Sequence, residues 1–109
     1  MVKLILKNIK EVETKFHNQI KSVCKEKEQY YNQLFKKYDK DLTLEVIFDK
    51  SSALYKISAS LNLKSKKILV LEEDKDVLKA LTKLFSELKK VIKKQYELER
   101  KDYTYKRKR

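Results

Sequence analysis

The side chains that most often perform catalysis or bind metal ions are scarce in this sequence. It contains one histidine, His17, and one cysteine, Cys24, which lie seven residues apart and can therefore share one face of a helix. Zinc sites need four ligands when they are structural, and three ligands plus a water molecule when they are catalytic. One His and one Cys cannot supply such a set, even with Glu13 and Glu28 nearby, and we expect no metal site.

Carboxylates are more numerous, and four of them stand close together at Glu72, Glu73, Asp74 and Asp76. General acid or base catalysis needs a pocket that shifts a carboxyl pKa, and an exposed, mutually repelling run implies no such pocket. We interpret the run as a helix start, where negative charge is favourable. The sequence has no glycine, which excludes Gly-rich phosphate-binding loops. We expect no enzymatic activity, no cofactor and no small-molecule substrate.

Positive charge is the property that implies a ligand. The 109 residues include 28 Lys and Arg against 16 Asp and Glu, a formal net charge of +12. Such an excess on a small domain favours a polyanionic partner, with nucleic acid as the leading class. A membrane surface is the competing polyanion, but apolar and charged residues are interleaved, and neither a spanning segment nor a signal peptide is recognisable. We expect no membrane partner and a cytoplasmic protein, which a lone cysteine also fits.

The spacing of the apolar residues predicts four strands and two helices. Alternation with a period of two predicts strands, and recurrence every three or four residues predicts helices. The expected strands are residues 2–7, 42–48, 54–63 and 67–71. The first expected helix is long, over residues 12–38, with a possible bend at Lys27. The second has its apolar stripe over residues 77–96.

This order, β-α-β-β-β-α, predicts an α+β fold with a four-stranded mixed sheet and two helices packed on one face. The helix between the first two strands favours a right-handed crossover, which makes those strands parallel and leaves the others antiparallel. Residues 1–100 are expected to form one domain and residues 101–109 a frayed basic tail. The opposite sheet face is expected to hold the polar side chains of Lys3, Lys7, Thr43, Lys56, Ser58, Ser60 and Asn62.

With these elements placed, the sequence resembles the ribosome hibernation-promoting factor family, the ribosome-associated translation inhibitors. The third strand, Tyr55-Lys56-Ile57-Ser58-Ala59-Ser60-Leu61-Asn62-Leu63, follows the family pattern of an aromatic residue, Lys and alternating aliphatics that end in Leu-x-Leu. Two helix segments, Asp76-Val77-Leu78-Lys79-Ala80-Leu81-Thr82 and Leu88-Lys89-Lys90-Val91-Ile92-Lys93-Lys94, align with the family's last helix without a gap. The resemblance is best over residues 54–97.

This resemblance implies a ribosome hibernation factor that binds the decoding region of the small ribosomal subunit. The expected partners are the small subunit with its rRNA and the intact ribosome. The family's position there implies that the protein blocks the mRNA and tRNA channel, and so regulates translation as an inhibitor in a stress response. The chain resembles the short members of the family, which lack the additional C-terminal domain that pairs ribosomes.

The residues expected to contact rRNA phosphates are basic. Lys90, Lys93 and Lys94 match basic positions of the family, and Lys79 and Lys83 lie along the same side of the helix. The remaining candidates are Lys56, Lys36, Lys37, Lys106, Arg107, Lys108 and Arg109. Near the C-terminus, Tyr103 and Tyr105 could stack on single-stranded RNA. A solvated helix face and a disordered tail explain these lysine and arginine runs without any function.

Two other functions are compatible with the sequence. A module of the double-stranded RNA-binding type would read A-form grooves. Such domains usually carry a lysine cluster at the start of their last helix, where this sequence is acidic. A structural protein that pairs its long first helix with a partner helix is the other alternative, although Lys27 interrupts the seam that such pairing requires.

Overall fold

The computed structural model describes residues 1–107, with the side chains of residues 1–101. Its strands and helices are β1 (Val2–Lys7), two short 3-10 turns (Ile9–Glu11 and Thr14–Phe16), α1 (His17–Leu34), β2 (Leu42–Ser51), β3 (Leu54–Asn62), β4 (Lys67–Asp74) and α2 (Val77–Arg107). The strands form one sheet in the order β1-β2-β3-β4. The predicted β-α-β-β-β-α order and α+β class are confirmed.

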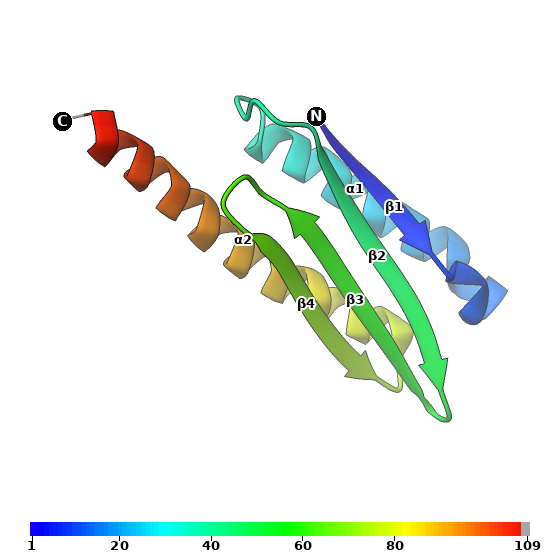
Figure 1. Ribbon diagram of the computed structural model, residues 1–109. Coiled ribbons are helices and arrows are strands. Elements are labelled where there is room, and N and C mark those ends of the chain that lie inside the picture. Colours follow the sequence, from blue (N-terminus) through cyan, green and yellow to red (C-terminus); the bar gives the residue numbers. More distant parts are fainter. Residues whose placement is uncertain (108–109) are drawn as a thin grey trace.

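The sheet is mixed, as expected from the crossover between its first two strands. β1 runs parallel to β2, with Val2 opposite Leu42, whereas β2, β3 and β4 are antiparallel neighbours. Both helices lie behind the same face of the sheet in Figure 1, α1 behind β1 and β2 and α2 behind β3 and β4. We call the uncovered side the open face. The C-terminal part of α2 extends past the sheet (Figure 1).

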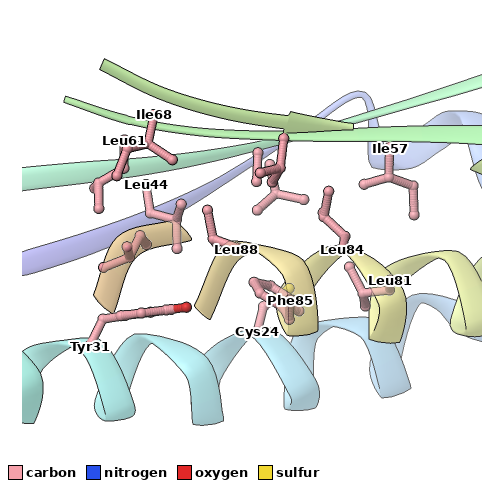
Figure 2. Close-up of a cluster of buried hydrophobic side chains, with 14 of the residues drawn as sticks. Cys24, Tyr31, Leu44, Ile57, Leu61, Ile68, Leu81, Leu84, Phe85 and Leu88 are labelled. Carbon is pink, nitrogen blue, oxygen red and sulfur yellow. The ribbon is translucent and has the colours of Figure 1, made fainter. Parts of the chain in front are cut away.

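One hydrophobic core fills the space between the sheet and the helices. Leu84 and Leu88 of α2 point toward the strands, where Leu44 lies fully buried (Figure 2). Tyr31 and Cys24 enter the same core from α1. Burying each large aliphatic side chain stabilises the fold by about 1.5–3 kcal/mol, so this layer fixes both helices on the sheet.

The predicted helix over residues 12–38 is wrong at both ends. Val12 has extended backbone angles and follows a 3-10 turn, and α1 begins only at His17 and ends at Leu34. Beyond Leu34 the chain turns tightly, with Tyr38 N–H donating to the Phe35 carbonyl at 3.0 Å. Apolar residues every three or four positions fit 3-10 and tight turns as well as an α-helix, so spacing alone overestimated the length.

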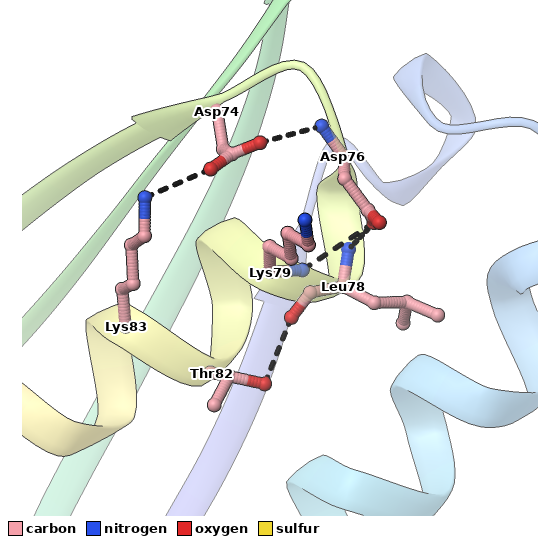
Figure 3. A network of polar contacts seen from close by, with 6 residues as sticks. All are labelled: Asp74, Asp76, Leu78, Lys79, Thr82 and Lys83. Atoms are coloured by element: carbon pink, nitrogen blue, oxygen red, sulfur yellow. Dashed lines mark hydrogen bonds and ion pairs between the residues drawn. The ribbon is translucent and has the colours of Figure 1, made fainter.

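The acidic run was placed wrongly as well, because most of it belongs to β4. The strand continues to Asp74, with Glu73 opposite Lys56 on β3. Only Asp76 caps α2: its Oδ1 accepts hydrogen bonds from the backbone N–H of Leu78 at 2.9 Å and of Lys79 at 3.4 Å (Figure 3). A helix start needs one such acceptor, and the other carboxylates extend the strand past its apolar part.

α2 continues through Arg107 and thus includes most of the segment expected to be a tail. The side chains from Asp102 onward, including Tyr103, Tyr105, Lys106 and Arg107, lie outside the described part of the chain. Lys108 and Arg109 lie outside the described residues altogether. The division into a domain over residues 1–100 and a tail remains a prediction.

Candidate RNA-binding surface

Four exposed lysines of α2 form a ridge along the side that faces away from the core. We call Lys79, Lys83, Lys90 and Lys94 the α2 ridge. The opposite side of the helix is fully buried against the sheet, as at Leu84 and Leu88, so the helical period directs the ridge to solvent. With a rise of 1.5 Å per residue the ridge spans about 22 Å, the length of several nucleotides.

One ridge lysine is held by a carboxylate. Lys83 Nζ lies 2.8 Å from Asp74 Oδ2, and the other carboxylate oxygen of Asp74 accepts the backbone N–H of Asp76 (Figure 3). The hydrogen bond from Lys83 lowers the pKa of Asp74, and the same bond raises the pKa of Lys83. This pair joins the end of β4 to the second turn of α2 and fixes where the ridge begins.

A groove between the end of α1 and the C-terminal half of α2 concentrates more positive charge. It encloses about 580 Å³ and is lined by Gln33, Leu34, Lys36, Lys37, Lys93, Tyr96, Glu97 and Arg100. We call it the α1–α2 groove. Four of its eight lining residues are cations and one is a carboxylate, so an anion is the ligand that its charge favours. Lys93 follows the ridge lysine Lys90 by three positions, so the two are neighbours on the surface of α2 and connect the ridge with the groove.

An aromatic cluster holds the groove in shape. The ring of Phe35 lies 4.8 Å from that of Tyr96 and 5.2 Å from that of Tyr38, measured between centroids. The Tyr38 hydroxyl donates to Glu99 Oε1 at 2.7 Å and accepts the backbone N–H of Lys64 at 2.9 Å. Desolvation raises the pKa of Tyr38 to about 12. α2 is thus tied to α1 and to the β3–β4 turn at the level of the groove.

The β3–β4 turn is attached to the same part of α2 by polar contacts. Glu99 accepts hydrogen bonds from the backbone and the hydroxyl of Ser65, and Gln95 Nε2 donates to the Ser65 hydroxyl at 3.0 Å. Lys64 in turn forms an ion pair with Asp39. These contacts keep the part of α2 that leaves the sheet in a fixed position.

The structure brings most of the predicted lysines together on the helical side. Lys36 and Lys37 share the groove with Lys93, although they lie more than fifty positions away in the sequence. Lys56 is separated from them, because it is exposed on the open face of β3, on the other side of the sheet. A flat ligand therefore cannot contact Lys56 and the groove at once.

Of the eight residues that line the groove, sequence reasoning missed five, among them Arg100 and Tyr96. The guanidinium carbon of Arg100 lies 5.8 Å from the centroid of the Tyr96 ring. The spacing offered a signal, since Lys93, Tyr96 and Arg100 follow one another at three and four positions and so share a face of α2. Lys89 was also omitted from the candidates, and its ammonium group lies 5.3 Å from the Tyr30 ring centroid on α1.

The two residues with metal-binding or nucleophilic chemistry have structural positions. His17 Nε2 bonds with the Val12 carbonyl at 2.7 Å and links the 3-10 turns to α1. Cys24 is buried in the core, and burial raises the pKa of its thiol to about 12. Among the side chains that the structure describes, no three His, Cys, Asp or Glu residues are grouped as a metal site would require. Within the described chain, no helix combines the length and the apolar character needed to cross a membrane.

Two solved structures share this fold. The chain superimposes on a ribosomal subunit interface protein from Coxiella burnetii with a TM-score of 0.61, 15% sequence identity, and coverage of 89% of this chain and 99% of that one. It also matches the N-terminal domain of Thermus thermophilus Protein Y, with a TM-score of 0.57, 16% identity, and coverage of 85% and 96%. No protein-family model and no curated protein sequence matches the chain. The resemblance noted in the sequence is thus confirmed for the fold.

Proposed function

We propose that this protein is a ribosome-associated, non-enzymatic factor that binds the small ribosomal subunit through rRNA phosphates. The observation that carries the proposal is the fold shared with a ribosomal subunit interface protein over 89% of the chain, combined with a cationic surface on the helical side. The excess charge of +12 supports a polyanionic partner. A cytoplasmic location is part of the same proposal.

The proposed mechanism is occlusion of the mRNA and tRNA channel. The α2 ridge and the α1–α2 groove bind phosphate oxygens, which position a protein on RNA without reading its sequence. Structured rRNA is recognised largely by shape, and the fixed angle between α1 and α2 supplies a rigid complementary shape. With its helices on the rRNA, the compact sheet occupies space that mRNA and tRNA need, and translation is inhibited.

Co-sedimentation with purified small subunits and intact ribosomes tests the proposal. In the variant Lys90→Glu/Lys93→Glu/Lys94→Glu, three cations of the ridge and groove become anions. We expect binding at physiological salt to fall by at least about 100-fold, since each lost phosphate contact weakens binding and each new carboxylate repels the phosphates. Binding of the parent chain should also exclude a short mRNA from the small subunit.

The matched control is Lys3→Glu/Lys21→Glu/Lys25→Glu, which changes the net charge equally. Its positions are exposed around β1 and the adjoining side of α1, away from the groove. Near-parental binding of this control, with loss in the first variant, would support the proposed surface. Equal loss of binding in both variants would show that net charge alone, and not the proposed surface, determines binding. Unchanged binding of the first variant would rule the surface out. Equal affinity for any duplex RNA would favour a general RNA-binding module instead.

A further inference from the structure

The two edges of the sheet differ in how their backbones are covered. On the outer edge of β1, the Asn32 side chain accepts the N–H of Val2 at 2.7 Å and donates to the Val2 carbonyl at 2.9 Å. Glu28 accepts the N–H of Leu4 at 2.8 Å. Unpaired edge groups can pair with another strand, and proteins cover them to prevent this. α1 therefore blocks β1 as a pairing edge.

The other edge, β4, has none of these protections. It is eight residues long, lacks proline, and keeps an unbroken register with β3 from Lys67 to Asp74. No hydrogen bond from a side chain in the described part of the chain reaches its backbone. Leu69 is 65% exposed and Leu71 is 51% exposed, both on the open face. Its central residues 68–71 are apolar and its charged residues lie at its two ends. A long, regular edge strand with such an apolar centre is a site for strand addition.

On the open face, the sequence of β4 is complementary to itself in one antiparallel register, which on the core face pairs Ile68 with Glu72. Around a two-fold axis at Val70, Leu69 of one copy lies opposite Leu71 of the second, and Lys67 lies opposite Glu73. Each pair joins residues two or six positions apart, so both members stand on the same sheet face. A shift by one pair in either direction places a leucine opposite a charged side chain. Neither Lys67 nor Glu73 forms an ion pair within the described chain, although Glu73 has Lys56 as its cross-strand neighbour on β3.

We propose that β4 is a dimerisation edge whose occupant is a second copy of this chain, paired antiparallel about Val70. The two four-stranded sheets then become continuous, and the four exposed leucines form one apolar cluster between two pairs of opposite charges. The α2 ridge points away from the sheet and stays free in both copies. This inference does not depend on ribosome binding.

The dimer is expected to be weak and to strengthen with salt. A single strand pair buries less than the roughly 1,200 Å² of a typical stable interface. Two copies of net charge +12 also repel each other, and salt screens that repulsion. The affinity of the chain for RNA should change with salt in the opposite direction.

Sedimentation equilibrium of the full, nuclease-treated chain tests the proposal. We expect the mass to rise from 13.2 kDa toward twice that value with increasing protein concentration, and to do so at lower concentration when salt is added. Leu71→Lys, which places a lysine opposite Leu69, should remain monomeric. A parent chain that stays monomeric up to millimolar concentration overturns the proposal, as does a dimer that disappears when nucleic acid is removed.

A charge swap tests the register. Lys67→Glu and Glu73→Lys should each weaken dimerisation by about 3- to 30-fold, because the two-fold axis makes two like-charged pairs from one substitution. The double variant Lys67→Glu/Glu73→Lys should recover most of the parental affinity. Lys3→Glu on β1 is the control and should leave the dimer intact. Unchanged thermal melts show that each variant is folded; a double variant no better than the single ones overturns this register.

Discussion

At the scale of single residues, the pair of Asp74 and Lys83 gives the protein a defined response to pH. Their bond lowers the pKa of the carboxyl group from its ordinary 3.8 and raises that of the ammonium group from its ordinary 10.5. A lowered carboxyl pKa contributes stability above the unfolded value, which is lost as the pH falls through the folded value. A raised lysine pKa contributes stability below its unfolded value, which is lost as the pH rises through the folded value.

Replacing Lys83 with Met should therefore lower the free energy of unfolding most at intermediate pH. The difference from the parent chain should be constant between about pH 5 and pH 9 and shrink at both extremes. The pair lies at the surface, with Lys83 exposed and Asp74 half-buried, so the effect should be small. Urea unfolding at a series of pH values measures it. The control is Lys90→Met, which removes a ridge lysine that forms no ion pair with the side chains the structure describes. A difference that persists unchanged in acid would contradict the assignment to this pair.

Cys24 provides a second prediction, because it is the one cysteine in the chain and is buried in the core. With its pKa raised to about 12 by burial, the thiol is protonated at neutral pH and shielded from reagents. Its reaction with an aromatic disulfide reagent should be at least about 100-fold slower in the native protein than in denaturant. Comparable rates in both conditions would show that Cys24 of α1 is not buried in the core as described.

At the scale of elements, the sequence predicted those parts that local periodicity specifies. In β3, buried side chains alternate with exposed or half-buried ones, and α2 carries an unbroken apolar stripe, so both were recognised. The start of α1 and the end of β4 were not recognised. Val12 fits helical spacing although its backbone is extended, and Glu73 is a charged residue that an open sheet face accepts. The α2 ridge could be predicted because its lysines are spaced along one helix. The α1–α2 groove could not, because it is formed by the tertiary contact between two helices that are far apart in the sequence.

The attachment of β1 to α1 is one such tertiary contact, and Asn32→Ala tests its energetic weight. The substitution removes both hydrogen bonds to the backbone of Val2, a residue that is 2% exposed. Leaving buried backbone groups unpaired should lower the free energy of unfolding by about 1–3 kcal/mol. Gln33→Ala, at the exposed neighbouring position, should change it by less than about 0.5 kcal/mol. Equal effects in chemical denaturation would indicate that Asn32 matters only as a helix residue.

At the scale of the whole molecule, the distribution of charge determines how the affinity for RNA depends on salt concentration. Phosphate binding releases counterions, so the logarithm of the affinity should fall linearly with the logarithm of the salt concentration, with a slope of roughly 0.7–0.9 per neutralised phosphate. If Lys90, Lys93 and Lys94 each neutralise one phosphate of the small subunit, replacing all three with Gln should reduce the slope by about 2–3. Neutral Gln removes the contacts without adding repulsion, so the slope counts phosphates directly. Affinities of both chains for purified small subunits, measured at several salt concentrations, provide the two slopes. A variant with a lower affinity but the same slope as the parent chain would mean that these lysines act through local structure. Loss of their phosphate contacts would release fewer counterions and so reduce the slope.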